Sequence, residues 1–240
     1  MVRQPAGMTL QPQDYQLFEY LHAVKAATYD QVARDVYPTH KLESVGNRIR
    51  KIEDQRLIDI SISRRALGGK RYLSLSKKAF DEYVRTGTEM RIELKSDAIR
   101  HDLRLVDIRH HLMRSPRLIE YLTENQIQTW GHEHRYVNSD ALLRLKYKAD
   151  PFYVALEYEC SVKKGDRYDA FARRYYSLNL YTIVFIVSET QAALKQIMKA
   201  EAKIYQGKLP KFFYRLASDL LSDDAMIFYN VNNYSISLGV

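Results

Sequence analysis

Hydrophobic residues recur at spacings of three and four in three segments near the start of the chain, which predicts helices with one buried face. The first helix begins within residues 9–12, and the second runs from Thr28, a favourable N-cap residue, to just before Pro38. The third lies within residues 40–55. Its apolar stripe is predicted to consist of Leu42, Val45, Ile49 and Ile52.

Alternating apolar and polar residues replace the helical spacing after residue 56. The segments "LIDISIS" and "RYLSLS" are predicted strands, and Gly68 and Gly69 between them predict a β-hairpin. Three helices followed by a hairpin is the order of a winged helix-turn-helix. In that module the third helix enters the major groove of DNA and the hairpin, or wing, lies along the backbone.

Basic residues are concentrated in the same part of the chain. The formal net charge is +8, and residues 48–78 hold ten lysines and arginines against three acidic residues. Such side chains on the third helix and the hairpin can reach base edges or phosphates, although some winged helices contact proteins instead. The predicted DNA-binding residues are Lys41, Ser44, Asn47, Arg48, Lys51, Arg64, Arg65, Lys70 and Arg71.

The pattern changes to mixed helices and strands in the second part of the chain. We expect helices at 96–114, 117–124, 166–178 and 189–205, an antiparallel strand pair at 139–147 and 151–160, a buried strand at 180–188 and an edge strand at 225–231. The expected fold class is therefore α+β or α/β, with a winged helix-turn-helix domain at 1–88 and an α/β sandwich at 89–240.

Two glutamates stand two residues apart in the predicted strand "PFYVALEYEC". Side chains alternate between the faces of a strand, so Glu157 and Glu159 leave it on the same side. Like charges at this spacing repel each other. Either this face of the strand is solvated, or a cation such as a metal ion lies against it.

The order of helix, strands, helix and strand, with Asp140 on one strand and Glu157 on its neighbour, resembles the PD-(D/E)xK (restriction-endonuclease-like) nuclease fold. Together with the winged helix, the chain looks most like the replication-relaxation family of bacteria and plasmids. Short motifs within residues 10–190 carry the resemblance: "RHDLRLVDIRHHL", "SDALLRL" and "ALEYE".

The resemblance implies that Asp140 and Glu157 are ligands of Mg²⁺ or Mn²⁺, which would activate water against a phosphodiester. Glu159 departs from the family pattern, which has a lysine at this position. Lys163 or Lys164 can replace that lysine, Glu159 can be a third ligand, or the site is inactive and needs no cofactor. The candidate catalytic residues are therefore Asp140, Glu157, Glu159, Lys163 and Lys164.

By the same resemblance we expect a DNA-binding protein of a plasmid or mobile element, acting in replication, mobilisation or gene control. The first hypothesis is a regulator or accessory factor whose nuclease-like domain is degenerate and binds DNA or partner proteins, such as relaxase or replication proteins, or a second copy in a homodimer. The alternative is a divalent-metal-dependent DNA nickase or endonuclease.

Composition narrows the remaining classes. Hydrophobic residues make up 46% of the chain, so a large core can form. A single cysteine, Cys160, excludes an intramolecular disulfide and a cysteine-based zinc site. The sequence shows no long apolar run, signal peptide or glycine-rich phosphate loop, so we expect a cytoplasmic protein and no nucleotide hydrolysis.

Overall fold

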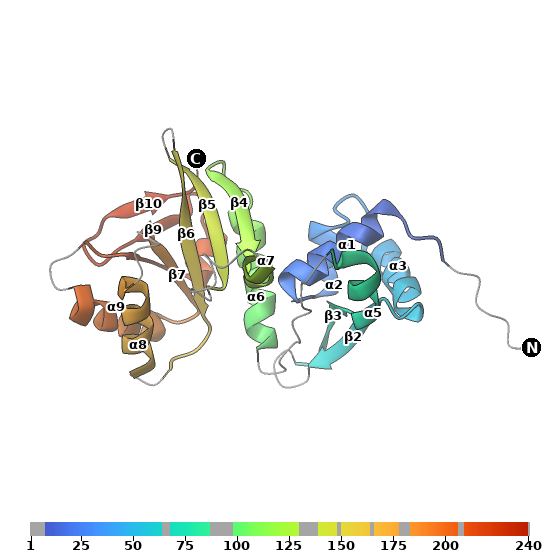
Figure 1. Cartoon of the computed structure of the whole chain (residues 1–240), viewed down its shortest axis with the longest axis horizontal. Helices are drawn as coiled ribbons and strands as arrows, with labels where there is room; N and C mark the ends of the chain where they lie inside the picture. Colours follow the sequence, from blue (N-terminus) through green and yellow to red (C-terminus); the bar gives the residue numbers. More distant parts are fainter. Residues whose placement is uncertain are drawn as a thin grey trace, which may run out of the picture. The chain divides into compact units, whose positions relative to one another are not determined.

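A computed structural model describes residues 8–63, 68–86, 98–129, 139–147, 150–163, 166–177, 183–205 and 209–239. The chain is a mixed α+β protein that divides into two compact units, Met1–Val106 and Asp107–Val240 (Figure 1). In the described ranges, no helix combines the length and the apolar character needed to span a bilayer.

The division between the units falls inside helix α6 (Ile99–Leu112), whereas the sequence predicts it at 88/89, outside the described residues. The first half of α6 belongs with the N-terminal unit. Gln31 donates a hydrogen bond from Nε2 to the carbonyl oxygen of Leu103 over 2.8 Å, and Ile99 and Leu103 pack with Ala26.

The N-terminal unit contains the three predicted helices and the predicted hairpin. The helices are α1 (Pro12–Val24), α2 (Tyr29–Asp35) and α3 (Leu42–Asp54), and the hairpin strands are β2 (Ile58–Ser63) and β3 (Lys70–Leu75). The two-residue strand β1 (Ala26–Ala27), too short for any periodicity to predict, pairs with β3 and gives the sheet order β1-β3-β2. The helices α5 (Lys77–Ala79) and η1 (Phe80–Val84) follow β3.

Helix α3 is held in place by its apolar residues. Val45, Ile49 and Ile52 are buried and join the core of the unit with Leu17 of α1 and Leu73 of β3. The predicted stripe is wrong at its first position, because the side chain of Leu42 is 54% exposed. Leu42 is the first residue of the helix, and the buried residues of α3 begin one turn later, at Val45.

The C-terminal unit is built on a seven-stranded sheet with the order β10-β9-β8-β7-β6-β5-β4. Its strands are β4 (Leu118–Thr123), β5 (Ala141–Tyr147), β6 (Asp150–Glu159), β7 (Val184–Ser188), β8 (Phe212–Leu216), β9 (Ile227–Tyr229) and β10 (Ser235–Ser237). Strands β4, β5 and β6 form an antiparallel meander, as predicted for β5 and β6, and β6, β7 and β8 run parallel.

Two helices pack together against the sheet, α8 (Asp166–Ser177) and α9 (Gln191–Tyr205) (Figure 1). Tyr168 and Tyr175 of α8 join Ile197 of α9 and Ile186 of β7 in one buried cluster. Phe185, which alternates with Ile186, stacks on Phe228 of β9 with ring centroids 4.1 Å apart. Both faces of β7 are therefore covered, as its apolar run predicts.

The predicted helix at 117–124 is wrong: these residues form strand β4 and the start of helix α7 (Glu124–Thr129). Leu118, Tyr121 and Leu122 have helical spacing, but a bulge between Leu118 and Glu120 shifts the two-residue alternation of a strand.

Near the C-terminus, strand β8, helix α10 (Ala217–Ser222) and strand β10 are not predicted from the sequence. The predicted edge strand at 225–231 is β9, which lies between β8 and β10 and is therefore not at an edge.

Candidate functional site

The solvent-facing side of α3 carries polar and basic residues. Lys41, the N-cap residue, and Ser44, Asn47 and Lys51 are all exposed, whereas the residues between them that face the core are buried. The spacings of three and four residues place these four side chains on one face. On the hairpin, Lys70 and Arg71 are exposed, and the predicted tip residues Arg64 and Arg65 lie outside the described residues.

Arg48 is different from the other predicted residues of α3, because its guanidinium is held within the unit. Its Nε donates to Oδ1 of Asp14 over 2.9 Å, and its Nη2 donates to Oδ2 of Asp14 and to the carbonyl oxygen of Thr9. The Asp14 side chain is 0% exposed and also accepts hydrogen bonds from the Gln11 amide and the Tyr37 hydroxyl. Arg48 therefore ties α3 to α1.

Electrostatics connect the basic side chains of α3 with those of the hairpin. Burial raises the pKa of Tyr29, the first residue of α2, and the charge of Glu53 adds to the rise. The positive charges of Arg71 and Arg50 act on the same hydroxyl in the opposite direction. Arg50, an exposed residue absent from the predicted DNA-binding residues, and Arg71 are therefore both close enough to Tyr29 for their charges to act on its hydroxyl.

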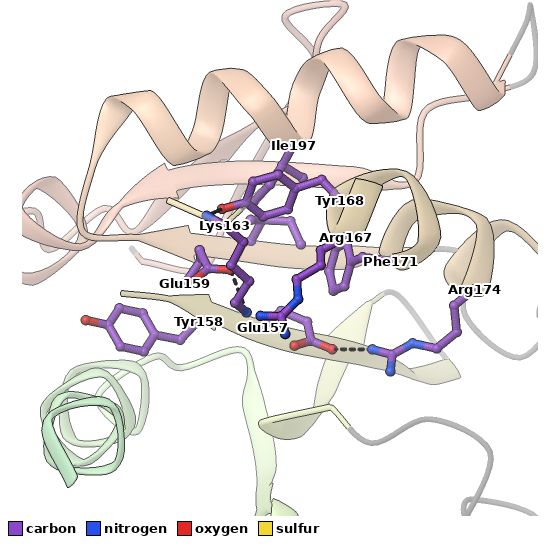
Figure 2. Close-up of a pocket in the computed structure, with 10 residues that line it drawn as sticks. Glu157, Tyr158, Glu159, Lys163, Arg167, Tyr168, Phe171, Arg174 and Ile197 are labelled. Carbon is purple, nitrogen blue, oxygen red and sulfur yellow. Dashed lines mark hydrogen bonds and ion pairs between the residues drawn. The ribbon is translucent and has the colours of Figure 1, made fainter. Parts of the chain in front are cut away.

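The C-terminal unit has a pocket of about 290 Å³ beside the end of β6, which we call the β6 pocket (Figure 2). Both glutamates of the strand line it, so they leave the strand on one side as the alternation predicts. Its other side chains are cationic, aromatic or aliphatic, and come from α8, the loop before it, α9 and the strands β6 and β7: Tyr158, Lys163, Arg167, Tyr168, Phe171, Arg174, Ile186 and Ile197.

Asp140 lies next to Glu157 across the strand pair. Ala141 of β5 pairs with Leu156 of β6, and the two strands are antiparallel. Asp140, the residue before Ala141, therefore lies opposite Glu157, the residue after Leu156. The Asp140 carboxylate accepts a hydrogen bond from the backbone amide of Tyr158 over 2.7 Å. The structure therefore brings together the two carboxylates that the resemblance assigns to a metal ion.

Glu157 lies in the wall of the β6 pocket, in surroundings that disfavour its charge. Burial raises its pKa to about 8, and the nearby charge of Asp140 adds to the rise. The hydroxyl of Tyr175 donates a hydrogen bond to Oε1 of Glu157, and Nη2 of Arg174 approaches the same oxygen to 3.3 Å. These two contacts lower the pKa, but they only partly offset burial.

Glu159 forms an ion pair with a lysine of the pocket. Nζ of Lys163 lies 2.7 Å from Oε2 of Glu159, and the backbone amide of Ser161 donates to Oε1 over 3.3 Å. Burial alone would lower the pKa of Lys163, but the hydrogen bond and charge of Glu159 outweigh it and raise that pKa overall. Lys164, the other candidate lysine, lies outside the described residues.

The carboxylates offer two ligands to a divalent cation rather than three. Within the ranges that the structure describes, no group of three or more histidine, cysteine, aspartate or glutamate side chains is arranged to hold a metal ion. Asp140 and Glu157 nonetheless fit Mg²⁺, which prefers oxygen ligands and is commonly bound through one or two carboxylates and several waters. A bound cation would also favour the charged form of Glu157, which burial and the charge of Asp140 disfavour.

Four pocket residues on α8 are absent from the sequence-based candidates: Arg167, Tyr168, Phe171 and Arg174. The signal was present, because residues 167 and 174 are seven apart and therefore two helical turns apart on one face. Their meaning depended on knowing that this face of α8 lies over β6, which only the structure shows.

Comparison of the chain with protein-family models, with curated proteins and with solved structures finds no match. A function for the chain therefore has to be argued from its own two surfaces: the basic face of α3 and the hairpin, and the β6 pocket.

Proposed function

We propose that this chain is a DNA-binding protein whose N-terminal unit is a winged helix-turn-helix that docks on double-stranded DNA. The observation that carries the proposal is the face of α3, where Lys41, Ser44, Asn47 and Lys51 are exposed while the opposite face is buried. The order of α1, α2, α3 and the hairpin supports it, since this is the order in which such modules present a recognition helix and a wing.

The chemistry of the exposed residues suits both parts of DNA recognition. Asn47 can donate and accept at a base edge, whereas Lys51, Lys70 and Arg71 can bind phosphates. We propose that Arg48 positions α3 rather than contacting DNA, because its ion pair with Asp14 holds α3 against α1.

Binding to a fluorescent DNA duplex, measured at several salt concentrations, tests the proposal. Lys51→Ala should weaken binding and reduce the salt slope by about 0.9, the value for one lost phosphate contact on duplex DNA. Lys199→Ala is the matched control, because Lys199 is an exposed lysine on α9 in the other unit. Equal binding and equal salt slopes for the two variants would contradict the winged-helix assignment.

For the C-terminal unit we propose a PD-(D/E)xK-like fold whose site is degenerate and serves to bind DNA or partner proteins. The order of α6, the meander β4–β6, α8 and the parallel strand β7 supports the fold. The pairing of Glu157 with Arg174 and of Glu159 with Lys163 supports the loss of metal chemistry, since each glutamate already has a cation. The setting we propose is a plasmid or mobile element, with replication or mobilisation proteins or a second copy as partners.

A metal-dependent nickase or endonuclease is the second candidate, and the proximity of Asp140 and Glu157 favours it. These two residues would hold the cation, which supplies activation of water and compensation of charge. Lys163 would take the place of the lysine of the family pattern, and its ammonium is already fixed by Glu159 at the β6 pocket.

Incubation with supercoiled plasmid in Mg²⁺, in Mn²⁺ and in chelator separates the two candidates. Nicking that requires metal and disappears in Glu157→Gln would establish the enzyme. The control is Glu82→Gln, an exposed glutamate of η1. Plasmid that stays supercoiled while the wild type and both variants retard it equally supports the binding protein.

A further inference from the structure

Among the described residues that line the β6 pocket, Arg167 is the one cation that does not pair with a pocket carboxylate. Lys163 is paired with Glu159, and Arg174 with Glu157. Arg167 is exposed at the start of α8 and has no hydrogen-bond or ion-pair partner within the part of the chain that the structure describes. Figure 2 shows its side chain extending from α8 over the pocket, so the pocket offers a guanidinium to an anionic ligand.

The same face of α8 places an aromatic ring between two arginines. Phe171 stands four residues after Arg167 and three before Arg174, so the three side chains lie along one side of the helix. The Arg174 guanidinium carbon lies 5.7 Å from the centre of the Phe171 ring. The ring is half-buried and lines the pocket, and it contacts Phe212 on its inner side.

Size and lining together indicate the class of ligand. A volume of about 290 Å³ is near the lower limit of small-molecule pockets, so one nucleotide unit can enter but a duplex cannot. Arginine binds phosphate through two parallel hydrogen bonds, and an aromatic face stacks on a base of any sequence. Phe171 and Ile197 supply the apolar wall that a base or sugar requires.

We propose that the β6 pocket receives one nucleotide of an unpaired DNA strand, with Arg167 binding its phosphate and Phe171 contacting its base or sugar. The choice of DNA as the source of the nucleotide rests on the proposed function. The pocket gives the C-terminal unit a ligand of its own, a single strand, beside the duplex proposed for the N-terminal unit.

Anisotropy of a labelled oligothymidylate of about 12 nucleotides, titrated with the full chain, tests the proposal. Arg167→Ala should weaken binding about tenfold, the loss expected for hydrogen bonds to a charged group, and reduce the single-strand salt slope by about 0.7. Arg173→Ala is the matched control, because Arg173 is an exposed arginine on the same helix that does not line the pocket. It should change the affinity less than twofold.

Two results would overturn the assignment. Arg167→Ala that binds the single strand as well as Arg173→Ala would show that the pocket does not take the strand. Inorganic phosphate that displaces the oligonucleotide as effectively as thymidine monophosphate would show an anion site without a nucleotide. Failure of the winged-helix proposal is distinguishable, because it would appear as an unchanged duplex affinity in Lys51→Ala.

Discussion

Arg48→Met should destabilise the N-terminal unit, although Arg48 lies on the helix proposed to read DNA. Removing one partner of a buried ion pair costs about 3–5 kcal/mol. The Asp14 carboxylate would keep two donors, the Gln11 amide at 2.6 Å and the Tyr37 hydroxyl at 3.4 Å, and Arg48 is 18% exposed. We therefore expect a loss of about 2–3 kcal/mol in the free energy of unfolding.

Hydrogen exchange of peptides from α3, followed by mass spectrometry, reports on this unit separately from the other. The expected loss corresponds to exchange about 30- to 140-fold faster for amides that open with the unit. Arg50→Met, a substitution of an exposed arginine on the same helix, should change the free energy by less than about 0.5 kcal/mol. The double variant Asp14→Asn with Arg48→Met should regain at least about 1 kcal/mol, because no unpaired buried charge remains.

Two results would contradict this expectation: Arg48→Met exchanges as slowly as Arg50→Met, or the double variant is no more stable than Arg48→Met. Either result would mean that the ion pair with Asp14 does not hold α3 against α1. Arg48 would then be available to DNA, as the sequence alone suggested.

Two further predictions concern the C-terminal unit. Glu201 is 0% exposed and accepts hydrogen bonds from the hydroxyls of Tyr176 and Tyr214, both at 2.7 Å. Glu201→Ala should therefore lower the free energy of unfolding, measured in urea, by about 3 kcal/mol. The control Lys203→Ala removes an exposed amine and should lower it by less than about 1 kcal/mol. Burial raises the pKa of Glu157 to about 8, above its value in the unfolded chain, so the metal-free unit should lose stability as pH rises from about 4.5 to 8. Melting temperatures measured across this pH range test the prediction. Glu157→Gln should remove the loss, and Mg²⁺ should reduce it if the ion binds at Glu157.

The helices of the N-terminal unit could be predicted because local signals decide them. The Thr28 hydroxyl caps α2 by accepting a hydrogen bond from the Gln31 backbone amide at 3.3 Å, and the Thr28 backbone amide donates one to Oε1 of Gln31 at 3.0 Å. The partner of Arg48 could not be predicted in this way. Asp14 lies 34 residues earlier, and an arginine on a polar stripe has the same pattern whether it faces DNA or a buried carboxylate.

In the C-terminal unit, the sequence did not predict the strands that form through pairing with distant strands rather than through a local pattern of apolar residues. β4 has helical spacing of its apolar residues, and its pairing with β5 made it a strand. β8 is a five-residue strand that pairs in parallel with β7 and antiparallel with β9, and both partners lie far from it along the chain or form only in the sheet. Strands β5 and β6 were predictable because the loop that joins them is short, and their register was enough to bring Asp140 beside Glu157.

The ion pairs of Glu157 and Glu159 distinguish strand binding from metal-dependent cleavage, because the two functions require different changes in the contacts of these carboxylates. Binding of a strand leaves the ion pairs of both glutamates in place, because Arg167 has no ion-pair partner among the described residues and is the cation that would bind the phosphate. Metal-dependent cleavage needs Glu157 to exchange the Tyr175 hydroxyl and Arg174 for a cation. That exchange is favoured only if the cation relieves the burial and the charge of Asp140 that together raise the pKa of Glu157. Binding is therefore the first proposal for this unit, and cleavage depends on the free energy of cation binding at this one pair of carboxylates.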